Sequence, residues 1–353
     1  MDCGDYGGKP ATAANPHCSF IRQQSTIRQQ RLRSRYAGDM NPFSLLQQLP
    51  AQLQQSSVRD LAWTLIAPPL LLDAQWPQRH PLAGSHWAHE PAKLTDWLRQ
   101  LDEDASTLET WLARSSNRRL GLYYEKLWQF AVQNAPDVQL LAANVAIRQG
   151  ANTLGEMDLL SRDGDGDHHT ELACKFFLGP EHACASEPLN WLGPSGQDRL
   201  GLKLAHLRQR QLTLSSRPEA QAALASLHIR DVQAELWLGG YLFYPWPSGC
   251  AMPRGAHPQH LRGHWLYRRQ WPEFAAQTNQ ARWQVLPRSR WLAPARADQD
   301  SSLTLAQLEL YLQQSAEFRA PLLLVQLEQQ ASGDWHEVQR LFLVKNDWPT
   351  LEA

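Results

Sequence analysis

The feature of this sequence that most constrains its fold is a four-residue turn motif between two apolar runs. The motif is Asp-Gly-Asp-Gly at residues 163–166, and residues 153–161 and 169–178 on either side are largely apolar and contain no proline. A turn of this composition between two strand-like runs predicts a β-hairpin. With the two middle residues of the motif at the tip, the register places Asp158 directly opposite Glu171, with their Cβ atoms roughly 5 Å apart.

Two carboxylates that face each other across a hairpin repel, so this register indicates a positive charge between them. A divalent metal ion is the natural candidate. Because residues two apart share a face of a strand, Glu156 is expected beside Asp158, and Ala173 and Lys175 beside Glu171. The opposite face is predicted to be core and carries Met157, Leu159, Leu172, Cys174 and Phe176. The alternative is a solvated sheet face on which Lys175 pairs with an acid, which adds little stability.

Helices and strands are predicted around the hairpin in a regular succession. Residues 119–132 have apolar positions at spacings of three and four, which predicts a helix, and the following run is predicted to be a strand. Beyond the hairpin, two helices and an apolar, aromatic strand are expected. The predicted ranges are 137–149 for the first strand, 197–212 and 216–227 for the two helices, and 232–244 for the last strand.

Three of these segments contain residues that resemble the motifs of the PD-(D/E)XK nuclease superfamily, whose core is αβββαβ. The matches are Glu125 in the first helix, Asp158 in Gly-Glu-Met-Asp, and Lys175 in Glu-Leu-Ala-Cys-Lys. The resemblance covers residues 119–245. The wider chain also looks like an uncharacterised bacterial family of domains of unknown function that has been proposed to belong to this superfamily. The resemblance therefore implies an α/β (α+β) fold with a restriction-endonuclease-like core.

The third motif departs from the family pattern. Ala173 stands where the family usually has its second carboxylate. Glu171 lies two residues earlier on the same face, and the hairpin register places Glu156 opposite Ala173, so either glutamate could fill the gap. The same departure could instead mark a core that no longer cuts. The alternative function is then a nucleic-acid-binding or scaffold module on a degenerate nuclease fold.

The resemblance implies metal-dependent hydrolysis of a phosphodiester in nucleic acid, either DNA or RNA. Its catalytic residues would be Asp158, Glu171, Lys175, Glu125 and Glu156. Of these, Asp158, Glu171 and Glu156 would hold Mg²⁺ or Mn²⁺, because hard oxygen ligands suit such ions. Lys175 would orient the attacking water or stabilise the transition state. Judged alone, Glu125 is an ordinary helix glutamate, and only the company of the other acids suggests a role for it.

The helix predicted over residues 197–212 carries several basic side chains. Arg199, Lys203 and Arg208 are the candidates for contacts with a nucleic-acid backbone. The alternative is a solvated helix face. His168 and His169 follow the hairpin turn without a metal-ligand partner at a recognisable spacing, so we expect them on the hairpin surface.

Composition constrains the function less sharply. The 353 residues contain 34 Lys and Arg against 35 Asp and Glu, so no global basic charge indicates nucleic acid, although a local basic surface remains compatible with a nuclease. The five cysteines are scattered, which predicts a reducing compartment without a disulfide framework or a zinc cluster. No run is long and apolar enough for a membrane span, so a cytoplasmic protein without a membrane partner is expected.

The remaining parts flank the core. Residues 1–39 are polar and mildly basic, and we interpret them as a disordered or mis-assigned extension, with a basic arm for phosphates as the alternative. Residues 40–117 are predicted to be a helical region, with helices at 58–65, 91–101 and 106–112.

Residues 246–353 are rich in Trp and Arg and are expected to be mixed, ending in a hairpin of strands 321–329 and 335–345. Tryptophans interleaved with arginines can stack bases and hold phosphates. Packing of the cations on the rings inside the fold is the favoured alternative. A third possible function is the binding of a peptide or a sugar by this region.

Overall fold

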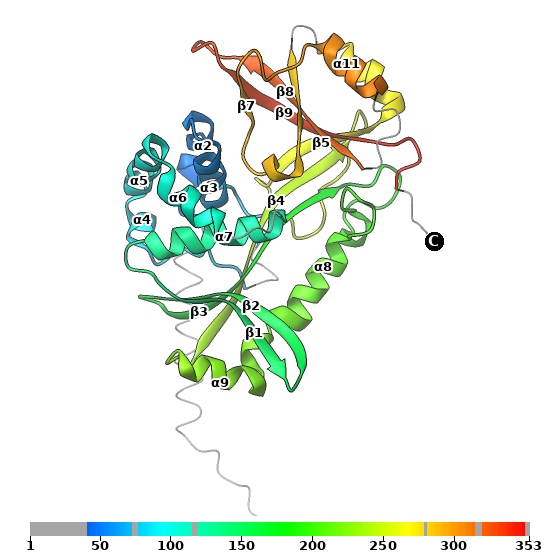
Figure 1. Ribbon diagram of the computed structural model, residues 1–353. Coiled ribbons are helices and arrows are strands. Elements are labelled where there is room, and N and C mark those ends of the chain that lie inside the picture. Colours follow the sequence, from blue (N-terminus) through cyan, green and yellow to red (C-terminus); the bar gives the residue numbers. More distant parts are fainter. Residues whose placement is uncertain (1–40, 73–76, 115–118, 279–280, 315–319, 350–353) are drawn as a thin grey trace, which may run out of the picture. The chain divides into compact units, whose positions relative to one another are not determined.

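The computed structural model describes residues 41–72, 77–114, 119–278, 281–314 and 320–349. The prediction for residues 1–39 lies outside the described residues. Within them, a group of helices precedes a large mixed sheet (Figure 1). The protein is therefore a mixed α/β fold with a helical N-terminal region, as predicted.

The N-terminal helices match the predicted helical region. Prolines stand at the starts of α2 and α5, where the missing N–H has no helical partner to lose. Their apolar sides join one large core together with α7, and Trp63 in α3 is 3% exposed, which fits a packing role. The helices are α2 (Leu49–Gln52), α3 (Ser56–Ile66), α4 (His86–His89), α5 (Pro91–Glu103) and α6 (Ser106–Ala113).

The order helix, three strands, helices, strand is confirmed in the structure. The elements are α7 (Leu120–Asn134), β1 (Gln139–Gln149), β2 (Asn152–Asp163), β3 (Gly166–Leu178), α8 (Leu200–His206), α9 (Pro218–Ser226) and β4 (Val232–Pro245). Strands β1, β2 and β3 are antiparallel, and β4 runs parallel to β3. Helix α7 shares a core with one face of the sheet, whereas α8 and α9 cover separate clusters.

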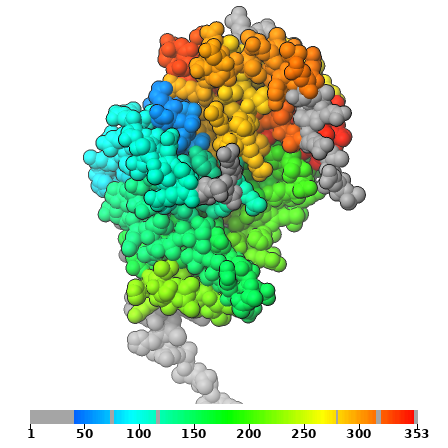
Figure 2. Space-filling view, viewed as in Figure 1, coloured from blue at the N-terminus to red at the C-terminus, as the bar shows by residue number. Residues whose placement is uncertain are grey.

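The C-terminal third continues the same sheet. The strand order is β1-β2-β3-β4-β5-β9-β8-β6, with β7 paired to β9. The added elements are β5 (Leu261–Tyr267), α10 (Trp271–Ala275), β6 (Arg282–Leu286), β7 (Arg296–Ala297), α11 (Leu305–Gln314), β8 (Leu322–Gln329) and β9 (Trp335–Val344). Strands β8 and β9 form the predicted terminal hairpin. In the space-filling view, the N-terminal helices lie against C-terminal segments on one face (Figure 2), and Ala293 N donates to Asp60 Oδ1.

Rings and arginines of the C-terminal third pack on each other, as the favoured interpretation predicted. The Arg282 guanidinium lies 5.5 Å from the Trp335 ring centre, and that of Arg288 lies 5.7 Å from Trp291. Arg340 is buried, lies 3.9 Å from the Tyr241 ring centre and donates to the carbonyl of Trp291. These contacts stabilise the fold.

Among the described helices, none combines the length and apolar character that a membrane crossing requires.

The β2–β3 hairpin has the predicted tip and register, but its two strands part before their ends. Pairing runs from Asp163↔Gly166 to Leu159↔Thr170 and stops there. Strand β2 continues with β1 only, and β3 continues with β4 as far as Leu178. Asp158 and Glu171 would form the next pair, so they lie at the fork where the strands diverge.

The parting of the strands overturns one prediction. Glu156 does not lie opposite Ala173, because β2 has already left β3 at that point. It pairs instead with Ala146 of β1. Met157 also departs from expectation, since it packs in the cluster with Leu214 on the α9 side, whereas Leu159 packs with α7. The inward face of β2 therefore switches beside Asp158.

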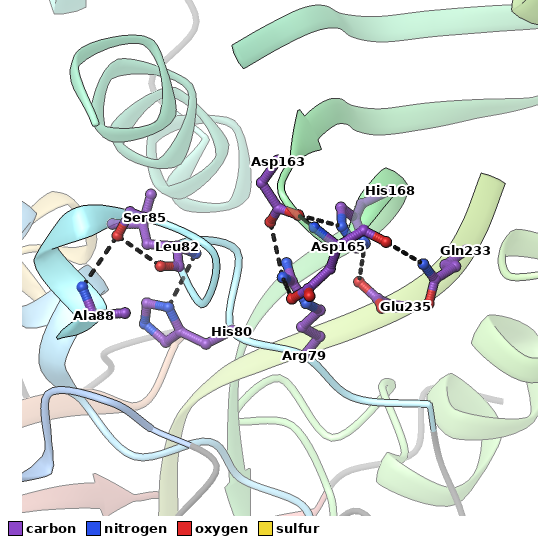
Figure 3. Close-up of polar contacts among 10 residues, drawn as sticks. All are labelled: Arg79, His80, Leu82, Ser85, Ala88, Asp163, Asp165, His168, Gln233 and Glu235. Carbon is purple, nitrogen blue, oxygen red and sulfur yellow. Dashed lines mark hydrogen bonds and ion pairs between the residues drawn. The ribbon is translucent and has the colours of Figure 1, made fainter. Parts of the chain in front are cut away.

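His168 and His169 are buried, and the prediction of a surface position is wrong. His168 lies between Asp163 and Glu235, with Nε2–Oδ1 and Nδ1–Oε2 distances of 3.0 and 3.2 Å (Figure 3). Arg79 holds Asp163 from the other side, with Nη2 2.8 Å from Oδ2. This network joins the hairpin tip to β4 and to the segment before α4, and so fixes the strands that carry Asp158 and Glu171.

Candidate active site at the strand fork

Asp158 lies at the fork, where its carboxylate bonds to the backbone of β3 because β2 and β3 no longer pair there. Where the ladder ends, the backbone N–H of Leu172 in β3 has no strand partner in β2, and Asp158 Oδ2 accepts it at 2.9 Å. A buried N–H has to be paired, so the side chain replaces the missing backbone acceptor. Within the described residues, Oδ1 of Asp158 is left for another ligand.

Glu171 is the most buried acid of the site, with 1% of its surface exposed. Its two carboxylate oxygens have separate partners. Nε2 of His169 lies 2.7 Å from Oε1, and Gln211 donates to Oε2 at 3.0 Å. Nδ1 of His169 in turn lies 3.1 Å from the hydroxyl of Ser215. The carboxylate is therefore held in one orientation by groups from β3 itself and from the segment that follows α8.

Glu125 and Glu156 are held by one amide. The Asn144 side chain donates to Glu156 Oε1 at 3.0 Å and to Glu125 Oε2 at 3.3 Å. The side-chain oxygen Oδ1 of Asn144 accepts a hydrogen bond from Gln129 Nε2 at 2.7 Å. Asn144 lies in the middle of β1 with φ of 53°, a left-handed conformation that asparagine tolerates better than most residues. The β1–β2 ladder skips Asn144 and Asp158, which lie opposite each other between paired neighbours.

The acids of the site disturb one another electrostatically. Burial, followed by the charges of Glu171 and Glu125, raises the pKa of Asp158 to about 8. Burial also raises the pKa of Glu125 to about 7, with smaller contributions from Glu156 and Glu171 and an opposing one from Asn144. Thus Asp158, Glu171 and Glu125 lie within electrostatic range of one another, and Glu156 lies within range of Glu125. This partly desolvated place favours a proton or a cation.

The basic side chains of the site are Lys175 and Lys203. Lys175 Nζ lies 2.6 Å from Asp198 Oδ2, so its ion pair is with the loop before α8. Lys203 projects from α8. Burial and the charge of Lys175 lower the pKa of Lys203, while Asp158, Glu171 and Asp198 oppose that shift. Lys203 therefore lies near Asp158 and Glu171, and Lys175 lies near Lys203.

The other two predicted nucleic-acid contacts lie before and after α8. Arg199 precedes α8, and its guanidinium donates to the Leu189 carbonyl at 3.0 Å. Arg208 lies on the exposed side of the π-helical turn after α8. Ala173, at the position of the usual second acid, is 8% exposed and packs with Leu204 and Leu207. The structure therefore brings Lys203 to the acids, pairs Arg199 with a backbone carbonyl, and gives Ala173 a packing role.

The donor set suits a hard divalent ion, although it does not close around one. No three His, Cys, Asp or Glu side chains in the described ranges are close enough to hold a metal ion together. Mg²⁺ typically keeps several waters and takes only one or two protein carboxylates, with substrate phosphates completing its shell. Asp158 and Glu171, with Glu125 and Glu156 near them, have the chemistry for such a partial shell.

Three residues of the site, Asn144, Asp198 and Gln211, were not predicted from the sequence, and a fourth, His169, was predicted in the wrong place. Asn144 could have been noticed as a polar residue in an otherwise apolar strand, although its conformation could not. His169 was identified but placed on the surface. Asp198 and Gln211 carry no signal in the sequence, because their partners Lys175 and Glu171 lie far away in the chain.

Comparison with known proteins adds a family but no activity. A family model described as "Domain of unknown function (DUF1853)" matches residues 59–344, which begin in α3 and include every strand of the sheet. The comparisons with curated proteins and with solved structures gave no match. None of these comparisons links the chain to a nuclease. The function therefore has to be argued from the strand fork and its side chains.

Proposed function

Because the chain belongs to the DUF1853 family, whose function is unknown, we propose its activity from the site: metal-dependent hydrolysis of phosphodiester bonds in nucleic acid. The observation that carries the proposal is the fork itself, where Asp158 and Glu171 meet beside Lys203 and Glu125. The αβββαβ order of elements agrees with the PD-(D/E)XK resemblance of the sequence. A partly desolvated group of acids with two lysines is costly for stability and is typical of a functional site.

The proposed metal is Mg²⁺ or Mn²⁺, with Asp158 and Glu171 as ligands and Glu156 or Glu125 assisting through water. When bound, such an ion supplies a water of lowered pKa and neutralises charge on the scissile phosphate. The protein supplies the orientation. Hydrogen bonds from His169 and Gln211 fix Glu171, and the Leu172 N–H fixes Asp158.

The two lysines take different parts in this proposal. Lys203 is desolvated and within range of both principal acids, so it can meet the non-bridging oxygens of a phosphate at the fork. Lys175 is paired with Asp198 and 30% exposed. It can release that partner to orient the attacking water or to stabilise the transition state. Both roles need a compact cation.

The test is a cleavage assay with the purified full chain. Plasmid, single-stranded DNA and RNA are each incubated with Mg²⁺, with Mn²⁺ or with chelator. Asp158→Asn keeps the size of the side chain and removes its charge, so cleavage is expected to fall by about 100-fold or more. Asp167→Asn, on the same hairpin in a pair with Arg162, is the matched control and is expected to cleave normally. Full activity of Asp158→Asn would exclude the assignment.

A second candidate function is nucleic-acid binding without cleavage, and Ala173 favours it. This residue packs against α8 where the resembled family has an acid, so the site has one ligand fewer than that pattern requires. Isothermal titration with Mn²⁺ separates the two candidates. Binding of oligonucleotides without saturable metal binding would favour the second candidate, and saturable binding that Asp158→Asn abolishes would favour hydrolysis.

The proposed compartment is the cytoplasm. Cys174, Cys184 and Cys250 are free thiols and form no disulfide within the described part of the chain. Free thiols persist where the compartment is reducing. A nuclease acting on cellular DNA or RNA would meet its substrate there.

A further inference from the structure

A cavity of about 600 Å³ lies between the loop before α8 and the C-terminal hairpin. Its wall includes two tryptophans, two basic side chains and the loop, namely Trp291, Trp348, Arg288, Lys345, Pro194 and Gln197. Asp347 also lines it, so the charged lining carries a net charge of +1 from Arg288 and Lys345 against Asp347. Ligand pockets commonly have volumes of about 300–1,000 Å³ and are lined in this mixed way.

The cavity adjoins the loop whose next residue, Asp198, pairs with Lys175. The loop residues that line it run directly into Asp198, which holds Lys175 at 2.6 Å. Trp348 donates from Nε1 to the Pro194 carbonyl at 2.9 Å and so ties the loop to the hairpin. Lys175 and Asp198 in turn lie within electrostatic range of Lys203, and so do Asp158 and Glu171. A chain bound at the fork can therefore extend into this cavity.

We propose that the cavity binds one or two nucleotides of a single-stranded nucleic acid whose phosphodiester lies at the fork. This inference rests on the proposed function and names its substrate as single-stranded. Trp348 is half-buried and offers part of its ring, while Arg288 is exposed with its guanidinium near the ring of Trp291. Bases stack on indole rings and on guanidinium planes, and Arg and Lys hold phosphates.

The size and lining of the cavity separate a single strand from a duplex. In a duplex the faces of the bases are stacked on their neighbours and cannot reach a ring inside a pocket without being flipped out. An unpaired nucleotide has that face free. The cavity therefore selects for single strands, ends or unpaired segments.

The experiment measures binding in the cleavage-silent Asp158→Asn background of the full chain. Fluorescence anisotropy compares a labelled twelve-residue oligo-dT with a hairpin duplex of the same charge. Arg288→Ala with Lys345→Ala is expected to weaken oligo-dT binding by about fivefold or more, and Trp348→Ala likewise. Trp348→Phe, which keeps an aromatic ring, should recover most of the affinity. Arg148→Ala, an exposed arginine on β1, is the control and should bind as the parent does.

The outcomes separate this inference from the proposed function. Oligo-dT binding that is unchanged by the cavity variants overturns the inference, whether or not the wild-type chain cleaves nucleic acid. Duplex bound as tightly as oligo-dT also overturns it, and so does an oligosaccharide or peptide that competes with oligo-dT only when the cavity is intact. Loss of single-strand binding in the cavity variants supports it even if no cleavage is found. Unchanged thermal melting of each variant shows that the fold is intact.

Discussion

The buried ion pairs of His168 give a stability prediction that can be worked from the structure. Its imidazole is 1% exposed and lies between the carboxylates of Asp163 and Glu235. Burial alone would lower the pKa of His168, but these two partners raise it to about 9 from the ordinary 6.5. That difference corresponds to about 3 kcal/mol of stabilisation of the folded state.

The sign of the pH dependence follows from the raised pKa. The folded protein binds the His168 proton more tightly than the unfolded chain does, so this contribution is fully present below pH 6.5. It falls as the pH rises and is lost above about pH 9. His168→Gln keeps a polar side chain but cannot be charged. The variant is therefore expected to be less stable than the wild type by about 3 kcal/mol at pH 6 and by under about 1 kcal/mol at pH 10.

Urea unfolding followed by tryptophan fluorescence measures this difference at pH 6, 8 and 10. Arg162→Gln is the matched control, because it removes an ion pair on the same hairpin from a side chain that is 39% exposed. Exposed pairs contribute about 1 kcal/mol or less, so this control should change little at any pH. A cost for His168→Gln that is the same at pH 6 and pH 10 would refute the reasoning.

Three further substitutions and one control, Gly121→Ala, probe the backbone and the site. Gly84→Ala would place a Cβ 2.2 Å from Asp163 Oδ2, so urea unfolding should show a loss of about 1–3 kcal/mol, and an unchanged midpoint would contradict the Asp163 network. Gly240→Ala would place a Cβ 1.8 Å from the Lys175 carbonyl at φ of 133°. Its melting temperature should fall further than that of Gly84→Ala, whereas Gly121→Ala on α7, with open space around it, should melt as the wild type does or higher. Asn144→Gly removes the amide that holds Glu125 and Glu156 without straining a positive φ, so cleavage should fall by about tenfold at unchanged stability, and unaltered kinetics would separate Asn144 from the site.

The hairpin and the order of elements could be predicted because their signals are local. The turn composition at residues 163–166 fixes which residues pair near the tip, and the observed pairs follow that register as far as Leu159 and Thr170. Apolar spacing likewise located α7, β1 and β4. These elements depend on neighbours within a few residues, and such patterns are present in the sequence itself.

The point where the pairing ends could not be predicted. It depends on β3 keeping β4 as its partner while β2 follows β1, and on the left-handed conformation of Asn144 opposite Asp158. A regular two-strand register extended past the fork placed Glu156 opposite Ala173, which is wrong. Pairings between segments far apart in the chain decide such endings, and an amino-acid pattern does not encode them directly.

The predicted surface position of His168 and His169 was wrong for a related reason. A polar residue next to a turn is expected at the surface. However, His168 and His169 also contact Glu235 and Ser215, which lie 67 and 46 residues away in the chain. Nor did the sequence indicate that β5 and β9 join the core sheet, because their parallel pairing links residues 261–267 with the end of the chain. Long-range contacts therefore account for most of what sequence reasoning missed.

The charge balance at the fork argues that these acids are kept for a ligand. A raised pKa means that the ionised Asp158 destabilises the folded state, since the folded protein favours the protonated form. Lys203 opposes this effect, but burial and repulsion by Lys175 lower the pKa of Lys203, and Lys175 itself is paired with Asp198. A fold without a ligand at this place would be more stable with an uncharged residue at Asp158. An arrangement that costs stability persists where function requires it, and a cation or a phosphate with its metal would relieve this one.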